Sequence, residues 1–268
     1  MRAWSPLPQK ALLRLNVNFT PLRAGSSAKS KRSGKRNFDA VIFDIDNVLV
    51  DTRASYTDTI RKTVQIYLGS RKPVLTRRDI EEFKSLGGYN DDWDTCYGLL
   101  KKFGKKEISM RKIVSIFQPL YLKHFVRYEK LLIPKMFLKK LRVAGLKLGI
   151  VTGRNRKEAR MALRRFKIEK LFHAMVTVDE TPKQFKKPHP YGLLKLSQKL
   201  GKNMRYLYVG DLMDDILAAK RAKNKMRIRS CGFFAAASSP EKMKRDLKKA
   251  GADFLCSSTN ELKSIILS

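Results

Sequence analysis

The sequence predicts an α/β protein in which a parallel sheet lies between two layers of helices and an all-helical segment is inserted. From Asp39 onward, short apolar runs alternate with stretches whose apolar residues recur at helical spacing. Residues 55–129 break this alternation, because they carry helix signals and no convincing strand. Alternating strands and helices favour a parallel sheet that is covered on both faces.

Five apolar runs predict the strands of this sheet. Buried strands of parallel sheets are short, continuous and rich in β-branched or aromatic residues. The runs are residues 40–45 (AVIFDI), 148–152 (LGIVT), 174–178 (AMVTV), 206–209 (YLYV) and 226–230 (MRIRS). The last has the weakest pattern, since Arg227 and Arg229 interrupt it.

Proline and glycine mark the ends of the helices that are expected to cover the sheet. One helix begins at Pro134 and stops at Gly145, and a second spans residues 190–200. A third runs from Ser239 to Gly251, with Ser239 expected as the N-cap before a first-turn proline. These segments supply the crossover connections that parallel strands require.

The inserted segment contains three helix starts. They are the capping-box pairs Ser55–Asp58 and Thr76–Asp79, and the single cap Ser109. Apolar residues at helical spacing follow each start, and Pro119 is expected to kink the third helix. The sequence therefore predicts an α/β core of residues 38–54 and 130–268 and a helical insert of residues 55–129.

Residues 1–37 differ from the rest of the chain, because they hold nine Lys or Arg residues and no acid. Their low complexity predicts a basic, disordered extension. Three explanations stay open: an arm that binds nucleic acid, an organelle transit peptide, or an unstructured extension from a start codon assigned too early.

Composition limits the class of protein. An apolar share of 43% is enough for a sizeable core, and no apolar run approaches the ~20 residues of a membrane span. The sequence thus predicts a soluble, cytoplasmic protein, with organelle import through residues 1–37 left open. The net charge of +34 favours anionic partners, whether phosphorylated metabolites, nucleic acid or acidic lipid. Cys96, Cys231 and Cys256 are typical of buried thiols in a reducing compartment.

The first predicted strand ends in Asp44-Ile45-Asp46-Asn47, which contains two carboxylates. Residues two apart on a strand face the same side, so Asp44 and Asp46 are expected side by side where the strand ends. In parallel sheets, ligands bind outside the carboxyl ends of the strands. Because adjacent carboxylates repel each other, a cation or a proton is expected between them.

Other polar residues follow later strands and would reach the same edge. Thr152 and Gly153 offer a hydroxyl and free amides, and Lys187 offers a point charge, which are all groups that bind phosphate. The fourth predicted strand leads into Gly210-Asp211, followed by Asp214 and Asp215. Clustered carboxylates suit magnesium, which prefers oxygen ligands.

These four motifs together resemble the haloacid dehalogenase superfamily. The matching residues are DIDN at 44–47, Thr152 of VTGR, Lys187 before Pro188, and GDLMDD at 210–215. The resemblance covers residues 38–268 and implies a Rossmann-like core. The helical insert is similar in placement to the cap of the phosphoglycolate-phosphatase-like members of subfamily IA.

The resemblance also implies a role for each matching residue. Asp44 would be the nucleophile that forms an aspartyl-phosphate, and Asp46 the general acid and base. Thr152, Gly153 and Lys187 would bind the phosphoryl group. Mg²⁺ would be held by Asp44, Asp211 and the backbone carbonyl of Asp46. Asp215 would support the metal shell or orient Lys187, with Asp214 as a further candidate. Electrostatics favours the same assignment, because a cation offsets the repulsion between a carboxylate nucleophile and an anionic phosphate ester.

One residue departs from the family pattern, since Asn47 stands where glycine is usual. Asparagine tolerates left-handed backbone, so the turn is expected to survive. An intact Asp44-x-Asp46 pair favours phosphoryl transfer over dehalogenation, because a halide leaves without a proton. A phosphatase acting on a small phosphomonoester, resembling phosphoglycolate phosphatase, is the predicted function.

Two alternatives stay open: a sugar-phosphate mutase of the same superfamily, and a nucleic-acid-binding protein on an inactive phosphatase scaffold. Residues 86–93 (LGGYNDDW) are interpreted either as a loop that enters the site or as a helix connection with a buried tryptophan. His124, His173 and His189 are not spaced as metal ligands, and His189 could touch the rim of the site.

Overall fold

The computed structural model describes residues 37–86, 89 and 91–267. Its main sheet has six strands in the order β5-β4-β1-β6-β7-β8, and every neighbouring pair is parallel. The strands are β1 (Ala40–Phe43), β4 (Lys147–Val151), β5 (Ala174–Val176), β6 (Tyr206–Gly210), β7 (Ile228–Phe233) and β8 (Phe254–Cys256). The predicted α/β class is confirmed. The predicted basic extension, residues 1–37, lies outside the described residues apart from Asn37.

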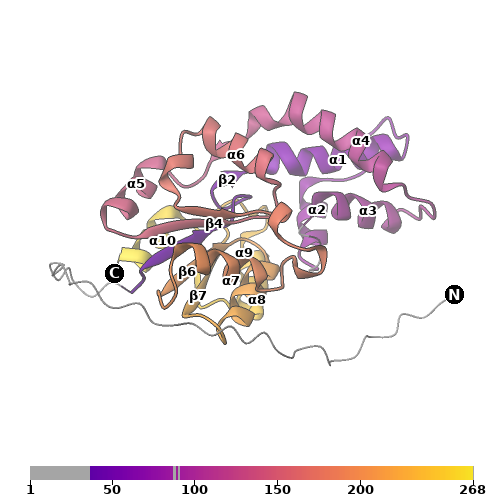
Figure 1. Cartoon of the computed structure of the whole chain (residues 1–268). Helices are drawn as coiled ribbons and strands as arrows, with labels where there is room; N and C mark the ends of the chain where they lie inside the picture. Colours follow the sequence, from indigo (N-terminus) through magenta and orange to yellow (C-terminus); the bar gives the residue numbers. More distant parts are fainter. Residues whose placement is uncertain (1–36, 87–88, 90, 268) are drawn as a thin grey trace, which may run out of the picture. The chain divides into compact units, whose positions relative to one another are not determined.

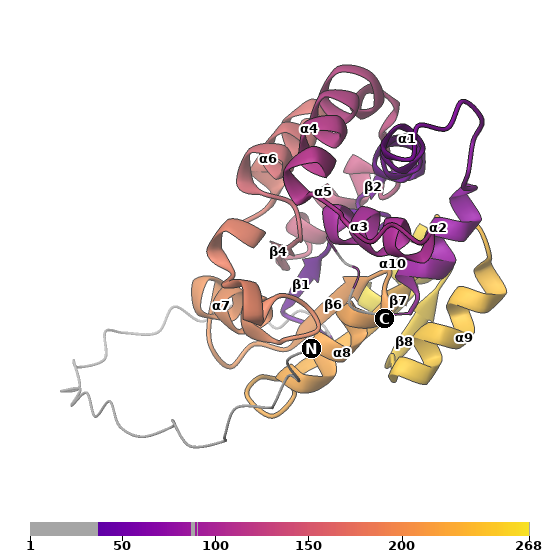
Figure 2. The same ribbon diagram turned by 90° about the vertical axis from the view of Figure 1, so that its right-hand side faces the viewer.

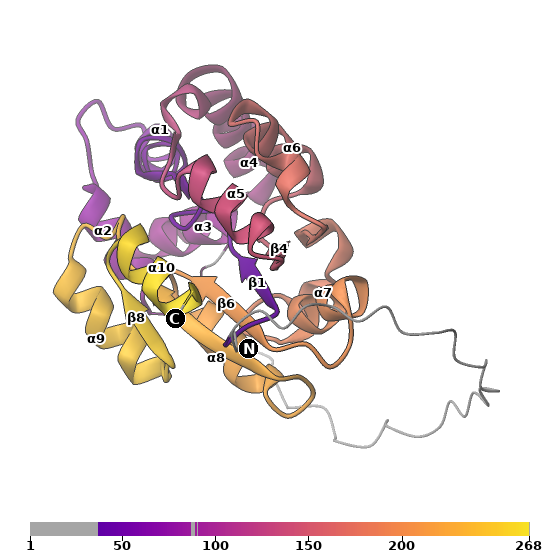
Figure 3. The ribbon, with the colours of Figure 1, turned by 90° about the vertical axis from the view of Figure 1, so that its left-hand side faces the viewer.

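Alternation along β1 divides the core between two faces of the sheet. Val41 and Phe43 belong to the cluster that includes apolar residues of three helices, which are α5 (Lys135–Val143), α6 (Arg156–Arg165) and α10 (Thr259–Leu267). Ala40 and Ile42 pack instead with α7 (Tyr191–Leu200) and α8 (Met213–Ala222). This is the period of two expected of a strand, and it gives helices on both sides (Figures 1 and 3).

The observed strands differ from the predicted ones at β1, β7 and β8. β1 ends at Phe43 rather than at residue 45, because the carbonyl of Ile45 accepts the amides of the following turn. β7 begins two residues later than predicted and extends to Phe233, where the chain is buried. β8 was not predicted, since its three residues give too short a pattern. Cys231 and Cys256 are buried in these two strands, as expected for core thiols.

The helical insert has a core of its own and is bounded by a short antiparallel pair, β2 (Val50–Asp51) and β3 (Lys130–Leu131). Its helices are α1 (Asp58–Tyr67), α2 (Arg77–Lys84), α3 (Asp92–Lys102) and α4 (Met110–Leu120). Buried side chains from all four helices form one cluster, which includes Ile60, Ile80, Leu99 and Phe117. Figure 2 shows the four helices gathered together, with α2 next to α9 (Pro240–Ala250).

Several predicted helix ends are confirmed. The side chains and backbones of Thr76 and Asp79 exchange both hydrogen bonds of a capping box, and Ser109 accepts the amide of Lys112. Gly145 and Gly251 take left-handed conformations, with φ of 80° and 93°. Both helices can therefore end there without a steric penalty.

Two predicted caps are wrong. Residues Arg53–Thr57 form a π-helical turn before α1, so Ser55 donates its hydroxyl to the carbonyl of Thr52 and makes no cap. Ser239 precedes α9 but its side chain makes no cap bond. Its amide and that of Ser238 donate to the carboxylate of Glu81 in α2. The helical insert thus supplies the acceptor for these amides.

Pro119 lies in the last turn of α4, and a second π-helical turn, Tyr121–Phe125, follows it. Proline lacks the amide that a regular helix would use here. Within the described ranges, no helix is both long and apolar enough to cross a membrane.

Candidate active site

The candidate site lies at the edge of the sheet where the parallel strands have their carboxyl ends. β1 has β4 and β6 as its two neighbours, so the ends of these three strands lie side by side there. Asp44, Thr152 and Asp211 each follow the last residue of one of these strands. A cavity of about 360 Å³ opens here, and Asp44, Asp46 and Asp211 are among its lining residues. Residues of the helical insert also line this cavity, so it lies between the sheet edge and the insert.

Asp44 is almost fully buried, with 3% of its surface exposed. Its Oδ1 accepts the amide of Ile45 at 2.7 Å, and its Oδ2 lies 3.0 Å from Lys187 Nζ. Burial raises the pKa of Asp44 to about 7, although Lys187 acts in the opposite direction. A carboxylate in this position gains from any further cation nearby.

Lys187 lies between two acidic side chains. Its Nζ is 2.7 Å from Asp215 Oδ1, which also accepts the hydroxyl of Tyr208 at 2.8 Å. Burial opposes the charged form of Lys187, but Asp215 and Asp44 outweigh it and hold the lysine pKa well above its usual value. Lys187 is therefore a fixed positive charge beside Asp44.

Asp44, Asp211 and Asp215 form a buried acidic trio whose oxygens lie within 4.8 Å of one another. Burial, Asp215 and Asp44 together raise the pKa of Asp211 well above its ordinary value. One lysine cannot balance three clustered carboxylates, and an all-oxygen donor set fits a hard divalent cation. Among the described residues, these three carboxylates form a group that could hold a metal ion.

Gly210 allows this approach, because a Cβ at that position would lie 2.3 Å from the Cβ of Asp215. Asp215 is also fixed by the amide of Leu212, which donates to its Oδ2 at 3.1 Å. Asp214 is buried but does not belong to the acidic trio. The close packing of Gly210 against Asp215 brings the start of α8 to the end of β6.

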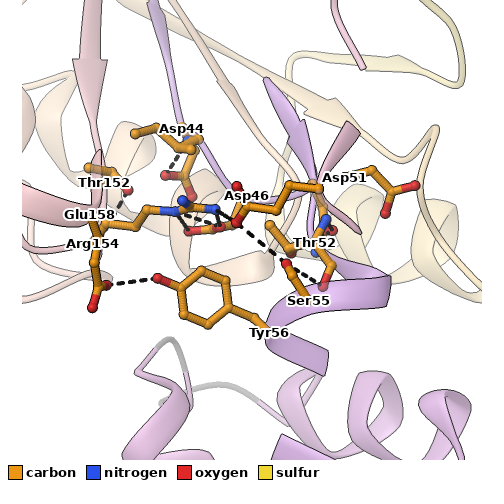
Figure 4. A network of polar contacts seen from close by, with 12 residues as sticks. Asp44, Asp46, Asp51, Thr52, Ser55, Tyr56, Thr152, Arg154 and Glu158 are labelled. Carbon is orange, nitrogen blue, oxygen red and sulfur yellow. Dashed lines mark hydrogen bonds and ion pairs between the residues drawn. The ribbon is translucent and has the colours of Figure 1, made fainter. Parts of the chain in front are cut away.

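Neither Asp44 nor Asp46 lies on β1, so strand alternation is not what places them, but both line the same cavity as predicted for the end of this strand. Phe43 ends β1, and Asp46 sits in the following turn, where it forms an isolated bridge with Val50. Its carboxylate is not part of the acidic trio and contacts Arg154, with Arg154 Nη2 2.7 Å from Oδ1 (Figure 4).

Asn47 adopts a left-handed backbone with φ of 52°, as expected for the residue that replaces glycine. Its amide group donates to Asp211 Oδ2 at 3.3 Å, and its Oδ1 accepts the amide and hydroxyl of Thr52. Asn47 thus joins the turn after β1 to the end of β6.

The remaining predicted phosphate-binding residues lie at the same edge. Thr152 is buried and its hydroxyl accepts the amide of Arg154 at 3.2 Å. Gly153 lines the main cavity, and it also lines an adjoining cavity of about 40 Å³ together with Thr152 and Lys187. The structure therefore brings together the predicted residues from four separate segments.

Part of the loop at residues 86–93 lies outside the described residues, namely positions 87, 88 and 90. Tyr89 packs on Phe83 with ring centroids 4.4 Å apart, while Asp91 and Trp93 line the main cavity. Asp91 caps α3 and pairs with Lys186 at 2.8 Å. The described part of this segment both begins a helix and borders the cavity.

No histidine belongs to the acidic trio of the described residues. His173 contacts Arg142 and the backbone of Leu148, away from the main cavity. His189 packs on the ring of Phe185, and it lines the adjoining cavity near Lys187.

Sequence reasoning missed two charged groups of the site. The VTGR motif predicts no role for Arg154, yet its side chain contacts Asp46 directly. Lys84 pairs with Asp92 at 2.5 Å, and both line the main cavity from the helical insert. The only signal for Arg154 was its place two residues after Thr152, and no signal marked Lys84.

A family model described as haloacid dehalogenase-like hydrolase matches residues 38–223. This chain belongs to that family. The resemblance carried by the four motifs is therefore confirmed. The turn after β1 and the ends of β4 and β6 of this haloacid dehalogenase-like hydrolase all fall inside the matched residues.

Curated relatives of this haloacid dehalogenase-like hydrolase are distant. A phosphoglycolate phosphatase of Salmonella typhi is 29% identical over 204 residues, which cover 70% of this chain and 79% of the relative. A pyrophosphatase of Bacillus cereus is 27% identical and covers 70% of this chain and 81% of its own length. An imidazoleglycerol-phosphate dehydratase of Phytophthora nicotianae is 28% identical over 68% of this chain, and only 41% of that relative is matched.

Solved structures share the fold. A protein of Haemophilus somnus described as a phosphoglycolate phosphatase superposes with a TM-score of 0.69, covering 87% of this chain and 99% of the other at 21% identity. A protein of Thermotoga maritima described as a β-phosphoglucomutase gives a TM-score of 0.61 at 23% identity, covering 85% of this chain and 98% of the other.

Proposed function

We propose that this hydrolase is a magnesium-dependent phosphatase that acts on a small phosphomonoester through an aspartyl-phosphate on Asp44. The observation that carries the proposal is the buried contact between Asp44 and Lys187, beside Asp211 and Asp215. A carboxylate nucleophile needs such positive charge to approach an anionic phosphate ester. The phosphatase names of two curated relatives support the same reaction class.

In the first step, an Asp44 oxygen forms a bond to phosphorus while the bond between phosphorus and the ester oxygen breaks. The leaving alkoxide takes a proton from Asp46, whose carboxyl group lines the same cavity. Lys187 stays close to Asp44 and offsets the charge that gathers on the phosphoryl oxygens.

In the second step, Asp46 takes a proton from a water molecule, which attacks the phosphorus of the aspartyl-phosphate. The bond between phosphorus and Asp44 breaks, so inorganic phosphate leaves and the Asp44 carboxylate is restored. One residue can serve both steps, because the acid of the first step is the base of the second. The hydroxyl of Thr152 and the amide of Gly153 are the donors proposed to hold the phosphoryl oxygens.

Asp44, Asp211 and Asp215 would hold Mg²⁺, together with the backbone carbonyl of Asp46. When bound, the ion supplies positive charge against which the buried carboxylates and the phosphoryl group can come together. The fit rests on the chemistry of the donor set, which is three buried carboxylates within 4.8 Å of one another.

The cavity favours a small substrate. Its volume is about 360 Å³, at the lower end of small-molecule sites. We propose that the helical insert acts as a cap that closes over the substrate and selects it, since its residues line the cavity opposite the catalytic edge. A phosphoglycolate-like ester matches the cavity size and the name of a curated relative.

The proposal is tested by hydrolysis of p-nitrophenyl phosphate with and without Mg²⁺. We expect metal-dependent release of phosphate that Asp44→Asn abolishes. Activity that survives Asp44→Asn would exclude Asp44 as the nucleophile. Conversion of a sugar phosphate to its isomer without net phosphate release would instead assign a mutase.

A further inference from the structure

Arg154 makes a set of contacts that the proposed mechanism does not require. It follows β4 directly after Thr152 and Gly153, and it is 4% exposed. Its Nη2 and Nε donate to Asp46 Oδ1 at 2.7 and 3.0 Å, whereas only one longer contact, from Nε at 3.3 Å, reaches Oδ2. The guanidinium therefore holds Asp46 mainly by one oxygen.

The other side of the guanidinium contacts residues of the helical insert and its boundary. Nη2 donates to Glu129 Oε1 at 2.8 Å, and Nη1 donates to the hydroxyl of Tyr121 at 3.2 Å. Tyr121 in turn donates to Glu129 at 3.0 Å. The ring of Tyr56 lies under the guanidinium, 4.8 Å from its central carbon. The guanidinium group that contacts Asp46 is thus also held by Glu129, Tyr121 and the ring of Tyr56.

In the described part of the chain, the hydrogen bonds to the Asp46 carboxylate all come from Arg154. Asp46 lies in a turn beyond the end of β1, and its side chain is 31% exposed. An unrestrained aspartate there would adopt several rotamers and would lose proximity to a bound ester. A planar guanidinium fixes a carboxylate in direction as well as in distance.

We propose that Arg154 is a positioning residue that orients Asp46, so that Oδ2 is the oxygen that gives and takes the catalytic proton. Oδ1 already accepts both short hydrogen bonds from Arg154, while Oδ2 keeps its capacity for a proton. Because Glu129, Tyr121 and Tyr56 fix Arg154, the orientation of Asp46 depends on the insert as well as on the sheet. This inference rests on the proposed function.

A positioning role of Arg154 has a consequence for catalysis that a purely structural role would not share. A proton from Asp46 matters when the leaving group is basic and matters little when the leaving group is stable as an anion. Phenyl phosphate and p-nitrophenyl phosphate are similar in size and differ in this respect. The quantity kcat/KM covers the steps up to the first bond cleavage, so slow release of phosphate from Asp44 does not obscure the comparison.

The test variant is Arg154→Met combined with Glu129→Gln. Glu129 is fully buried, and removing Arg154 alone would leave its charge without a cation. The double substitution removes both charges together, and a urea unfolding curve shows whether the variant protein is folded. Arg205→Met with Asp39→Asn is the matched control, because that bidentate pair lies at the amino ends of β1 and β6.

We expect the test variant to lose about 100-fold in kcat/KM on phenyl phosphate and less than about 10-fold on p-nitrophenyl phosphate. Asp46→Asn should show the same selectivity, and adding the test substitutions to it should not increase that selectivity. The control pair should leave the ratio of the two substrates unchanged.

Equal losses on both esters, or no loss on either, would overturn the role of Arg154 while leaving the phosphatase proposal in place. Selectivity that adds to that of Asp46→Asn would also overturn it, because Arg154 would then act through another group. A wild-type protein that hydrolyses neither ester would instead contradict the proposed function itself.

Discussion

Lys187 Nζ lies 3.0 Å from Asp44 Oδ2, although the two residues are far apart in the chain. The contact is buried, with 10% of the lysine side chain and 4% of the aspartate side chain exposed. A charge pair in such surroundings is screened far less than one at the surface. The electrostatic surroundings of Asp44 therefore include a residue from another segment.

Replacing Lys187 by methionine removes the positive charge beside Asp44. We expect kcat on p-nitrophenyl phosphate to fall by about 100-fold or more, since loss of one preorganised charge at a transition state has effects of that order. Lys186→Met is the matched control, because Lys186 pairs with Asp91 rather than with Asp44. Retention of full kcat in Lys187→Met, measured at saturating Mg²⁺, would contradict the assignment.

The raised pKa of Asp44 predicts how stability depends on pH in the metal-free protein. The folded protein binds a proton at Asp44 up to about pH 7, whereas the ordinary value is 3.8. Between these values the folded state holds more protons than the unfolded state, so the contribution of Asp44 to stability falls as pH rises.

Asp44→Asn removes this dependence. With EDTA present, we expect the free energy of unfolding of the wild type, minus that of Asp44→Asn, to decrease from about pH 4 to about pH 7. Urea unfolding at several pH values measures the difference. A difference that stays constant, or that rises with pH, would show that Asp44 is not protonated in this range.

Asp214 and Asp215 are adjacent in sequence but differ in their place in the site. Asp215 contacts Lys187 and belongs to the acidic trio, and Asp214 does not belong to it. We expect Asp215→Asn to lower kcat by about 100-fold and to weaken stabilisation by Mg²⁺. Asp214→Asn should retain most of both quantities.

Thermal unfolding with and without Mg²⁺ gives the second readout for these variants. A ligand that binds only the folded protein raises the free energy of unfolding. The increase grows with the logarithm of the ratio of the ligand concentration to the dissociation constant, once that ratio is well above one. Equal effects of the two substitutions on Mg²⁺ stabilisation would contradict the distinction between Asp214 and Asp215.

Asn47 combines a left-handed backbone with two hydrogen-bonded contacts, to Asp211 and Thr52. Asn47→Ala should cost about 2 kcal/mol in the free energy of unfolding, because it loses these bonds and adds backbone strain. Asn47→Gly should cost about 1 kcal/mol, since glycine accepts the φ value without strain. Urea unfolding checks the order, and an alanine variant as stable as the glycine variant would contradict it.

The sequence by itself determined the α/β class, the place of the helical insert and most of the residues at the catalytic edge. Local periodicity was sufficient for this, because a buried strand and an amphipathic helix each leave a short-range pattern. The motifs at Asp44, Thr152, Lys187 and Asp211 could be placed at one edge, since parallel strands all end on the same side. The end of β1, before Asp46, depended on the following turn, and β8 depended on its pairing with a neighbouring strand. Local patterns contain neither kind of information.

Only the tertiary structure decided which strands are neighbours and how the charged side chains pair. β1 lies between β4 and β6, and this order brings three chain segments to one cavity. Arg154 contacts Asp46 across 108 residues and Glu129 across 25, and no local spacing encodes either pairing. A side-chain contact of this kind depends on the packing of the whole chain, because the energy of a buried charge is set by its neighbours in space.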